Sequence, residues 1–172
     1  MFFLSIAMAL LEKFLLVKKS TLPGAGKGLF TKIDIKKGTR IVEYKGQKVT
    51  WKEVEKMADD RNGYVFYFTA KHCIDAWKTK KSVAHFANDA LGITRIEGVR
   101  NNSEYVTEKK HCYIEASKDI PKGAEILVGY GADYWKVIRY NIRLAQKNKL
   151  KEGKKPTVEL PHQQLAKRVK KD

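Results

Sequence analysis

Cysteine is scarce in this chain of 172 residues, which contains only Cys73 and Cys112. Two cysteines this far apart lack the paired spacing of a zinc site, and they are too few for the disulfide framework of a small secreted protein. The remaining titratable residues form no metal cluster or nucleophile triad that the sequence reveals. The sequence therefore predicts no structural metal and a reducing compartment.

Long hydrophobic runs are also missing. The apolar stretch at the N-terminus, MFFLSIAMALLEKFLL, is interrupted at Glu12 and is too short to span a bilayer. It also lacks the basic residues that open a signal peptide. We therefore expect residues 1–12 to be an N-terminal extension that packs or frays, and we expect no membrane association.

Negative charge is in short supply. Asp and Glu number 19 against 35 Lys and Arg, which gives a formal net charge of +16 and a pI near 9.8. Much of the excess lies in residues 136–172, which hold twelve Lys and Arg but only three acidic side chains. This charge predicts either a polyanionic partner, such as nucleic acid, or a basic tail that maintains solubility.

The glycine-rich segment GAGKGLF, residues 24–30, lacks the features of a nucleotide-binding loop. No Ser or Thr follows Lys27, as a mononucleotide P-loop requires, and Leu29 stands where a dinucleotide loop has its third glycine. The following residues alternate in polarity and are rich in β-branched side chains, so the loop is expected to connect two strands. No helix N-terminus is then available to hold a phosphate, and both nucleotide interpretations fail.

Short strand-like segments dominate the chain up to residue 131. Thr50 and Glu53 predict a capping box on one short helix, and residues 132–151 have helical periodicity. The small and apolar residues 81–90 are typical of a buried turn or short helix. The predicted strands cover residues 13–20, 39–49, 63–70, 73–77 and 120–131, with a hairpin over residues 103–120.

Many short strands with few helices predict a mostly β, α+β single domain. We expect this domain to cover residues 13–140. A basic helix, linker and mobile tail would then occupy residues 141–172, where Gly, Pro and Lys become frequent beyond Lys151.

Four motifs occur in an order that resembles the SET domain of protein-lysine methyltransferases. They are the G-x-G loop at residues 26–28, the E-Y-x-G strand at residues 43–46, HFANDA at residues 85–90 and EILVGY at residues 125–130. The resemblance implies short strands in small sheets with a C-terminal pseudoknot, followed here by a helix and a basic tail. The family's cysteine-rich flanking segments are absent, so the chain resembles compact bacterial or viral members without zinc modules.

The resemblance implies S-adenosylmethionine as the cofactor. In the family the G-x-G backbone approaches the methionyl part of this cofactor, a role that suits glycine because a Cβ would hold the ligand away. Asp89 replaces the family histidine, which leaves open whether cofactor affinity is preserved or altered, and Trp135 either covers the adenine or packs the helix. The implied cofactor-binding residues are Gly26, Lys27, Gly28, Leu29, Phe86, Asn88, Asp89, Tyr134 and Trp135.

Methyl transfer from a sulfonium to an amine is an in-line displacement, for which positioning supplies much of the acceleration. The lysine must first lose its proton, and an apolar channel beside a cation favours the neutral amine. By resemblance, Tyr130 is the catalytic tyrosine, Tyr44 lines the lysine channel and shares in catalysis, and Tyr64 forms a third wall. We expect Glu43 and Glu125 to stabilise the fold instead of acting as bases.

Two functions remain open at this point. The first is a protein-lysine N-methyltransferase acting on a basic nucleic-acid-associated protein, histone-like or ribosomal, with the tail contacting nucleic acid. The alternative is a catalytically inactive SET-fold module that binds nucleic acid or chromatin through its basic tail. Either implies the bacterial cytoplasm or nucleoid, or the nucleus of a eukaryote.

Overall fold

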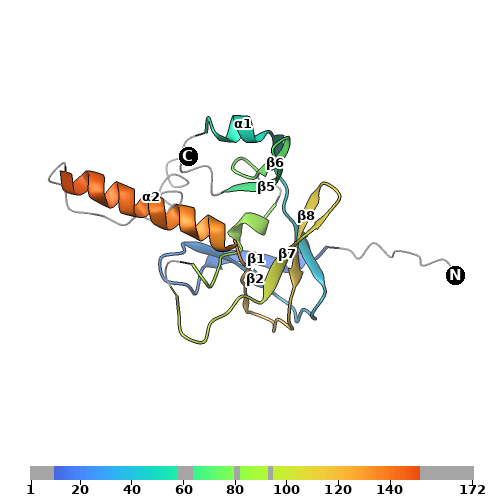
Figure 1. The fold of residues 1–172 in the computed structure, drawn as a ribbon. Coiled ribbons are helices and arrows are strands. Elements are labelled where there is room, and N and C mark those ends of the chain that lie inside the picture. Colours follow the sequence, from blue (N-terminus) through green and yellow to red (C-terminus); the bar gives the residue numbers. More distant parts are fainter. Residues whose placement is uncertain (1–9, 58–63, 80–81, 93–94, 152–172) are drawn as a thin grey trace.

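The computed structural model describes residues 10–57, 64–79, 82–92 and 95–151, and the described part is mostly β (Figure 1). The strands form small antiparallel sheets of three strands each. The first sheet has the order β1 (Leu15–Lys19), β2 (Lys27–Thr31), β9 (Glu125–Ile126). The second has the order β3 (Arg40–Glu43), β8 (His111–Ala116), β7 (Ser103–Glu108). The third has the order β4 (Gln47–Val49), β6 (His72–Asp75), β5 (Val65–Thr69).

Local sequence signals explain most of these elements. The glycine-rich loop joins β1 to β2, and the predicted hairpin is the pair β7 and β8, turning at Lys109, whose φ is +56°. The short helix α1 (Trp51–Val54) begins with the predicted capping box: the Thr50 hydroxyl accepts from the Glu53 amide, and the Glu53 carboxylate accepts from the Thr50 amide. These predictions are confirmed.

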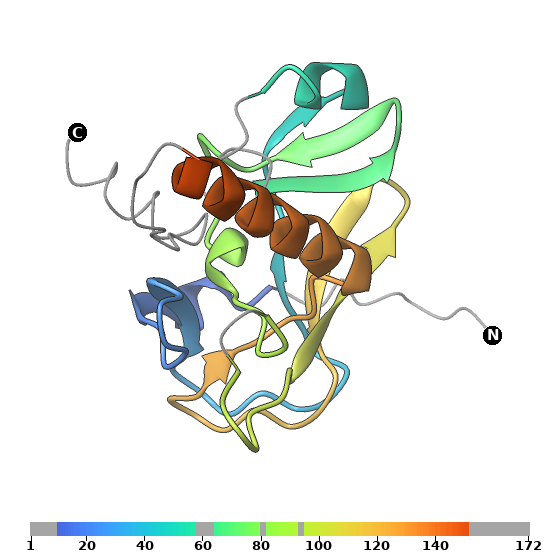
Figure 2. The same cartoon turned by 60° about the vertical axis from the view of Figure 1, so that its left-hand side comes forward.

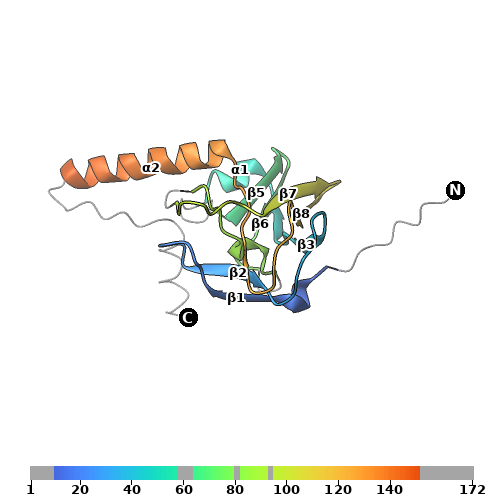
Figure 3. The same ribbon diagram turned by 90° about the horizontal axis from the view of Figure 1, so that it is seen from below.

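The remaining helices flank the predicted motifs. Two single 3₁₀ turns, η1 (Glu12–Phe14) and η3 (Ala84–Phe86), lie before β1 and within the HFANDA region. The long helix α2 (Ala132–Lys151) runs without a break past residue 140, the predicted end of the domain. It extends from the side of the molecule opposite β1 and β2 (Figure 3). Residues 1–9 of the predicted extension 1–12, and residues 152–172 of the predicted segment 141–172, lie outside the described residues.

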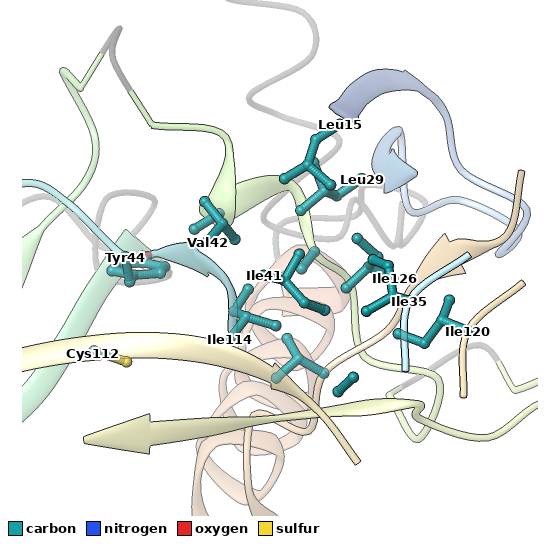
Figure 4. Packing of buried hydrophobic residues seen from close by; sticks show 14 of the residues in the cluster. Leu15, Leu29, Ile35, Ile41, Val42, Tyr44, Cys112, Ile114, Ile120 and Ile126 are labelled. Atoms are coloured by element: carbon teal, nitrogen blue, oxygen red, sulfur yellow. The ribbon is translucent and has the colours of Figure 1, made fainter. Parts of the chain in front are cut away.

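One hydrophobic core joins the sheets. Leu29 from β2, Ile41 from β3, Ile114 from β8 and Ile126 from β9 are fully buried, and their side chains meet in Figure 4. Each such side chain contributes roughly 1.5–3 kcal/mol on transfer from water. Strands that are distant in the sequence are therefore held together by shared burial.

The segment that contains β9 is bonded along both edges. On one side the Val128 amide donates to the Asn88 carbonyl at 2.8 Å. On the other side the Leu127 amide donates to the Asn102 side chain at 2.9 Å, and the Ser103 amide donates to the Leu127 carbonyl at 3.0 Å. This is the crossing that the predicted pseudoknot requires, and it places residues 125–130 beside η3.

None of the helices in the described part of the chain is long and apolar enough to cross a membrane.

Candidate active site

The glycine-rich loop is fastened by one buried carboxylate. Glu125 accepts hydrogen bonds from the Ser20 hydroxyl at 2.6 Å, the Thr21 amide at 2.7 Å and the Thr21 hydroxyl at 2.5 Å. A Cβ at position 28 would lie only 2.1 Å from a Glu125 oxygen, so this close approach requires Gly28. Glu125 therefore stabilises the loop, as the sequence predicted.

The backbone of Gly26 is open to the surroundings. Its φ of +71° is in the left-handed region that favours glycine, and an added Cβ would meet no atom within 4 Å. The next residue, Lys27, has an exposed side chain and its carbonyl accepts from Asn88, while Leu29 is fully buried in the core. Leu29 is paired with Val17 on one side and Ile126 on the other, so it contributes to the core and offers no exposed surface to a ligand.

Asn88 connects this loop to the HFANDA segment. Its side-chain amide donates to the Lys27 carbonyl at 3.0 Å and to a Glu125 oxygen at 3.1 Å. Phe86, two residues earlier, is half-buried, packs against the core and lies beside the His85 ring, with ring centroids 4.2 Å apart. The G-x-G and HFANDA motifs are therefore directly bonded, through residues that lie 61 positions apart in the sequence.

Tyr130 is fixed at both of its ends by the HFANDA segment. Its hydroxyl donates to the Ala87 carbonyl at 2.7 Å, and its amide donates to an Asp89 oxygen at 2.7 Å. Burial, with a smaller contribution from the nearby Tyr134, raises the pKa of Tyr130 well above its usual value. The phenol therefore keeps its proton near neutral pH.

The first turn of α2 packs on Tyr130. The Trp135 ring is stacked on the Tyr130 ring at 5.7 Å and 10°, and the Tyr134 ring meets it edge-on at 5.1 Å. Burial raises the pKa of Tyr134 to about 12. Trp135 also donates its indole N–H to Asp89 at 2.7 Å and lies against Gly92. In Figure 1 this end of α2 lies beside the green segment that contains η3, and Figure 2 shows α2 with its C-terminal end turned forward.

Tyr44 and Tyr64 meet on the other side of the cluster. The buried Tyr44 donates its hydroxyl to the Tyr64 carbonyl at 3.0 Å, and burial raises the pKa of Tyr44. The Tyr64 ring packs edge-on against Trp77 at 5.2 Å and lies 5.7 Å from the His85 ring. The predicted tyrosines are thus assembled, with Tyr64 joined to Tyr44 through its backbone.

Sequence reasoning missed Tyr105 of β7. Its ring meets Tyr44 edge-on at 6.0 Å and Phe66 at 5.2 Å. Burial raises its pKa well above the usual value, and Tyr130 and Tyr44 contribute in the same direction. Tyr105 therefore belongs to the tyrosine cluster. Strand alternation, which puts Tyr105 on the face of buried Ser103, was the signal that could have found it.

His85 is the other residue that the motifs did not explain. Its Nδ1 atom is buried and has no hydrogen-bond partner among the described residues. Burial lowers the pKa of His85 to about 4, so the ring is neutral near pH 7. The described residues contain no group of three or more His, Cys, Asp or Glu side chains placed to hold a metal ion.

Comparison with known proteins adds a family to this geometry. Residues 26–131 match the SET domain family. Among curated relatives, the N-lysine methyltransferase KMT5A-A of Danio rerio is 26% identical over 117 residues, covering 63% of this chain and 33% of the relative. The histone-lysine N-methyltransferase set-1 of Caenorhabditis elegans is 27% identical over 129 residues, covering 70% of this chain and 51% of the relative.

The fold has a counterpart among solved structures. The methyltransferase domain of human PR domain-containing protein 2 superposes with a TM-score of 0.52 and 22% identity, covering 69% of this chain and 78% of that domain. At this identity the likeness concerns the fold alone. The chain spans between a third and a half of the length of the curated relatives it matches.

Proposed function

This chain belongs to the SET domain family, and from that premise we propose that it is an S-adenosylmethionine-dependent protein-lysine N-methyltransferase. One observation supports the proposal above others. The G-x-G loop, the HFANDA segment and Tyr130 are joined by a continuous set of hydrogen bonds through Glu125, Asn88 and Asp89. A glycine loop open to a ligand and a tyrosine cluster built around the buried Tyr44 are thereby held in one place.

The cofactor side of the site would consist of backbone and aromatic groups. The open backbone of Gly26 permits close approach of the methionyl part, and the bonds from Asn88 and Glu125 hold the loop in position. Tyr134 and Trp135 would cover the adenosine part. When bound, the cofactor supplies an electrophilic methyl group on its sulfonium.

The substrate side would act on the lysine amine. Tyr44, Tyr105 and Tyr130 provide aromatic walls whose hydroxyls stay protonated because burial raises their pKa values. Such walls, next to a sulfonium, disfavour the ammonium form of the substrate, so its proton leaves to solvent before transfer. The neutral nitrogen would then take the methyl group that the bound cofactor supplies, with the C–N bond forming as the S–C bond breaks.

The hydrogen bond of Tyr130 defines its role in this step. Its hydroxyl proton is already donated to the Ala87 carbonyl, so the oxygen offers lone pairs only. It would accept an N–H from the amine and weak C–H contacts from the methyl group, which turns the nitrogen lone pair toward the methyl carbon. Tyr130 therefore orients the amine and does not remove its proton.

Calorimetry and turnover with Tyr130→Phe test this proposal. The wild type should bind S-adenosylmethionine with measurable heat and label lysine-containing proteins. Tyr130→Phe should keep cofactor affinity within a few-fold but lose about ten- to a hundredfold in kcat, the effect of one hydrogen bond to a reacting group. Tyr140→Phe, an exposed tyrosine of α2, is the matched control and should leave both values unchanged. Absence of binding heat in the wild type would favour the inactive module.

We further propose that the substrate is a basic nucleic-acid-associated protein, histone-like or ribosomal, in the cytoplasm, nucleoid or nucleus. The net charge of +16 supports an anion near the enzyme that is distinct from the basic substrate itself. The structure adds a basic face on α2, defined here as Lys136, Arg139, Arg143, Lys147 and Lys151. These residues recur at spacings of three and four and therefore share one side of the helix. Mass spectrometry of extracts treated with enzyme and labelled cofactor would identify the substrate.

A further inference from the structure

One buried carboxylate binds four donors around Tyr130. An oxygen of Asp89 accepts from the Leu91 amide at 2.8 Å and from the Asn101 side chain at 2.9 Å. The other oxygen accepts from the Tyr130 amide and from the Trp135 indole, both at 2.7 Å. Asp89 itself is only 6% exposed.

This set of partners requires a carboxylate. All four partner groups are N–H donors, and an ionised carboxylate is the side chain of this size that only accepts. An asparagine would place its own NH₂ group opposite two donors in either orientation. A histidine offers at most one acceptor nitrogen. The four bonds are thus specific to aspartate at this position and do not follow from membership of the family.

The oxygen shared by Tyr130 and Trp135 links two parts of the site. Tyr130 lies at the end of the crossing segment, whereas Trp135 belongs to the first turn of α2. Their rings are stacked, and Trp135 occupies the space that a Cβ at Gly92 would need, with its ring carbons 2.7 Å from that position. A single Asp89 oxygen therefore binds both the backbone amide of Tyr130 and the indole N–H of Trp135.

We propose that Asp89 is a positioning residue that couples the docking of α2 to the placement of the Tyr130 hydroxyl. The carboxylate acts through Tyr130 and Trp135, because its oxygens are already occupied by internal donors. The site is complete only when Trp135 is docked. This inference rests on the proposed methyltransferase function, since Tyr130 is the group that orients the amine.

A double-mutant cycle measures the coupling in the full-length chain. Asp89→Asn should lower kcat at saturating cofactor by about tenfold, the cost of unsatisfied buried donors. In a Tyr130→Phe background the same change should lower kcat by less than about twofold, because the hydroxyl it positions is gone. Cofactor KM should rise in both backgrounds through the loosened Trp135. Losses in kcat that multiply across the two variants would overturn the proposal.

Hydrogen exchange gives a second measurement that does not depend on activity. The chain has three tryptophans, so Trp135 contributes one of three indole N–H signals. Asp89→Asn should speed exchange of both the Trp135 indole and the Tyr130 amide by about tenfold, while the Trp51 and Trp77 indoles stay unchanged. Asp119→Asn, an exposed carboxylate that accepts from Lys36 and Lys37, is the matched control and should change neither signal.

The two measurements separate the possible failures. If the wild type transfers no methyl group but exchange changes as expected, the proposed function fails and the coupling stands. If only one of the two signals changes, the coupling is wrong whatever the activity. Should Asp89→Asn fail to fold, Trp135→Phe removes one donor without adding another. It should then speed exchange at the Tyr130 amide, and unchanged exchange there would overturn the coupling.

Discussion

At the scale of single residues, His85 makes the free energy of unfolding depend on pH. Its buried Nδ1 has no hydrogen-bond acceptor among the described residues that would stabilise the protonated ring. Burial lowers the pKa of His85 from 6.5 to about 4. A base with a lowered pKa binds fewer protons in the folded state than in the unfolded state between these two values. Its contribution to stability is therefore fully present above pH 6.5 and is lost as the pH falls toward 4.

We predict that His85→Phe removes this dependence. Between pH 7 and pH 4, the unfolding free energy of the wild type should fall by up to about 3 kcal/mol more than that of the variant. Urea unfolding at several pH values measures both curves. Carboxylates with a lowered pKa, such as Glu53 at the cap of α1, are present in both proteins and cancel. Parallel curves would show that His85 is protonated equally in both states.

At the scale of elements, the HFANDA segment is the connection between the glycine loop and the C-terminal strand. Asn88 supplies this connection twice, through its side chain to Lys27 and Glu125 and through its carbonyl to Val128. Removal of the side chain leaves the Lys27 carbonyl without this donor. The loop and the strand then remain joined through Glu125, through the sheet and through the buried contacts of Leu22 and Ala25 with Leu127.

We predict that Asn88→Ala lowers stability and cofactor affinity together. The unfolding free energy, measured by urea unfolding, should fall by about 1–3 kcal/mol. The dissociation constant for S-adenosylmethionine, measured by calorimetry, should rise. Asn148→Ala, an exposed position on α2, is the control. A larger dissociation constant at unchanged stability would show that Asn88 contacts the cofactor and does not connect the two segments.

Elements with local signals could be predicted from the sequence, and contacts between them could not. The capping box of α1 and the hairpin of β7 and β8 depend on neighbouring residues, so their pattern is visible in a few letters. Tyr130 and Tyr44 were found because they lie in motifs that resemble a family. Asn101, Tyr130 and Trp135, three of the four partners of Asp89, lie 12 to 46 residues away from it and leave no periodic pattern in the sequence. Tyr105 has the pattern of an ordinary strand residue.

At the scale of the whole molecule, the excess positive charge of residues 136–172 is divided between the basic face of α2 and the residues that follow it. Asp133 is the acidic residue in the first turn of α2, and the remaining nineteen positions of the helix contain no Asp or Glu. A face of one sign attracts a polyanion through release of counterions, an effect that weakens as salt rises. The substrate lysine, itself cationic, would be held elsewhere.

We predict that deletion of residues 152–172, which keeps α2 complete, leaves methylation of a free peptide unchanged. Methylation of the same protein bound to nucleic acid should slow, and the difference should fade as salt rises. Arg139→Gln with Arg143→Gln in the full chain tests the α2 face separately, with the same expected pattern. A truncation that slows both substrates equally, or neither, would assign the tail to solubility or to the fold.

The bonds between Glu125 and the glycine loop also determine when, during synthesis of the chain, the loop can take its final structure. The Ser20 hydroxyl can form its bond only after Glu125, 105 residues later in the sequence, has been synthesised. The Tyr130 ring can stack only after Trp135 has been added. Ribosomes add about 5–20 residues per second, so the early strands emerge seconds before these partners exist. A chain interrupted before residue 135 would carry every glycine of the loop but would lack the indole that stacks on Tyr130 and donates to Asp89.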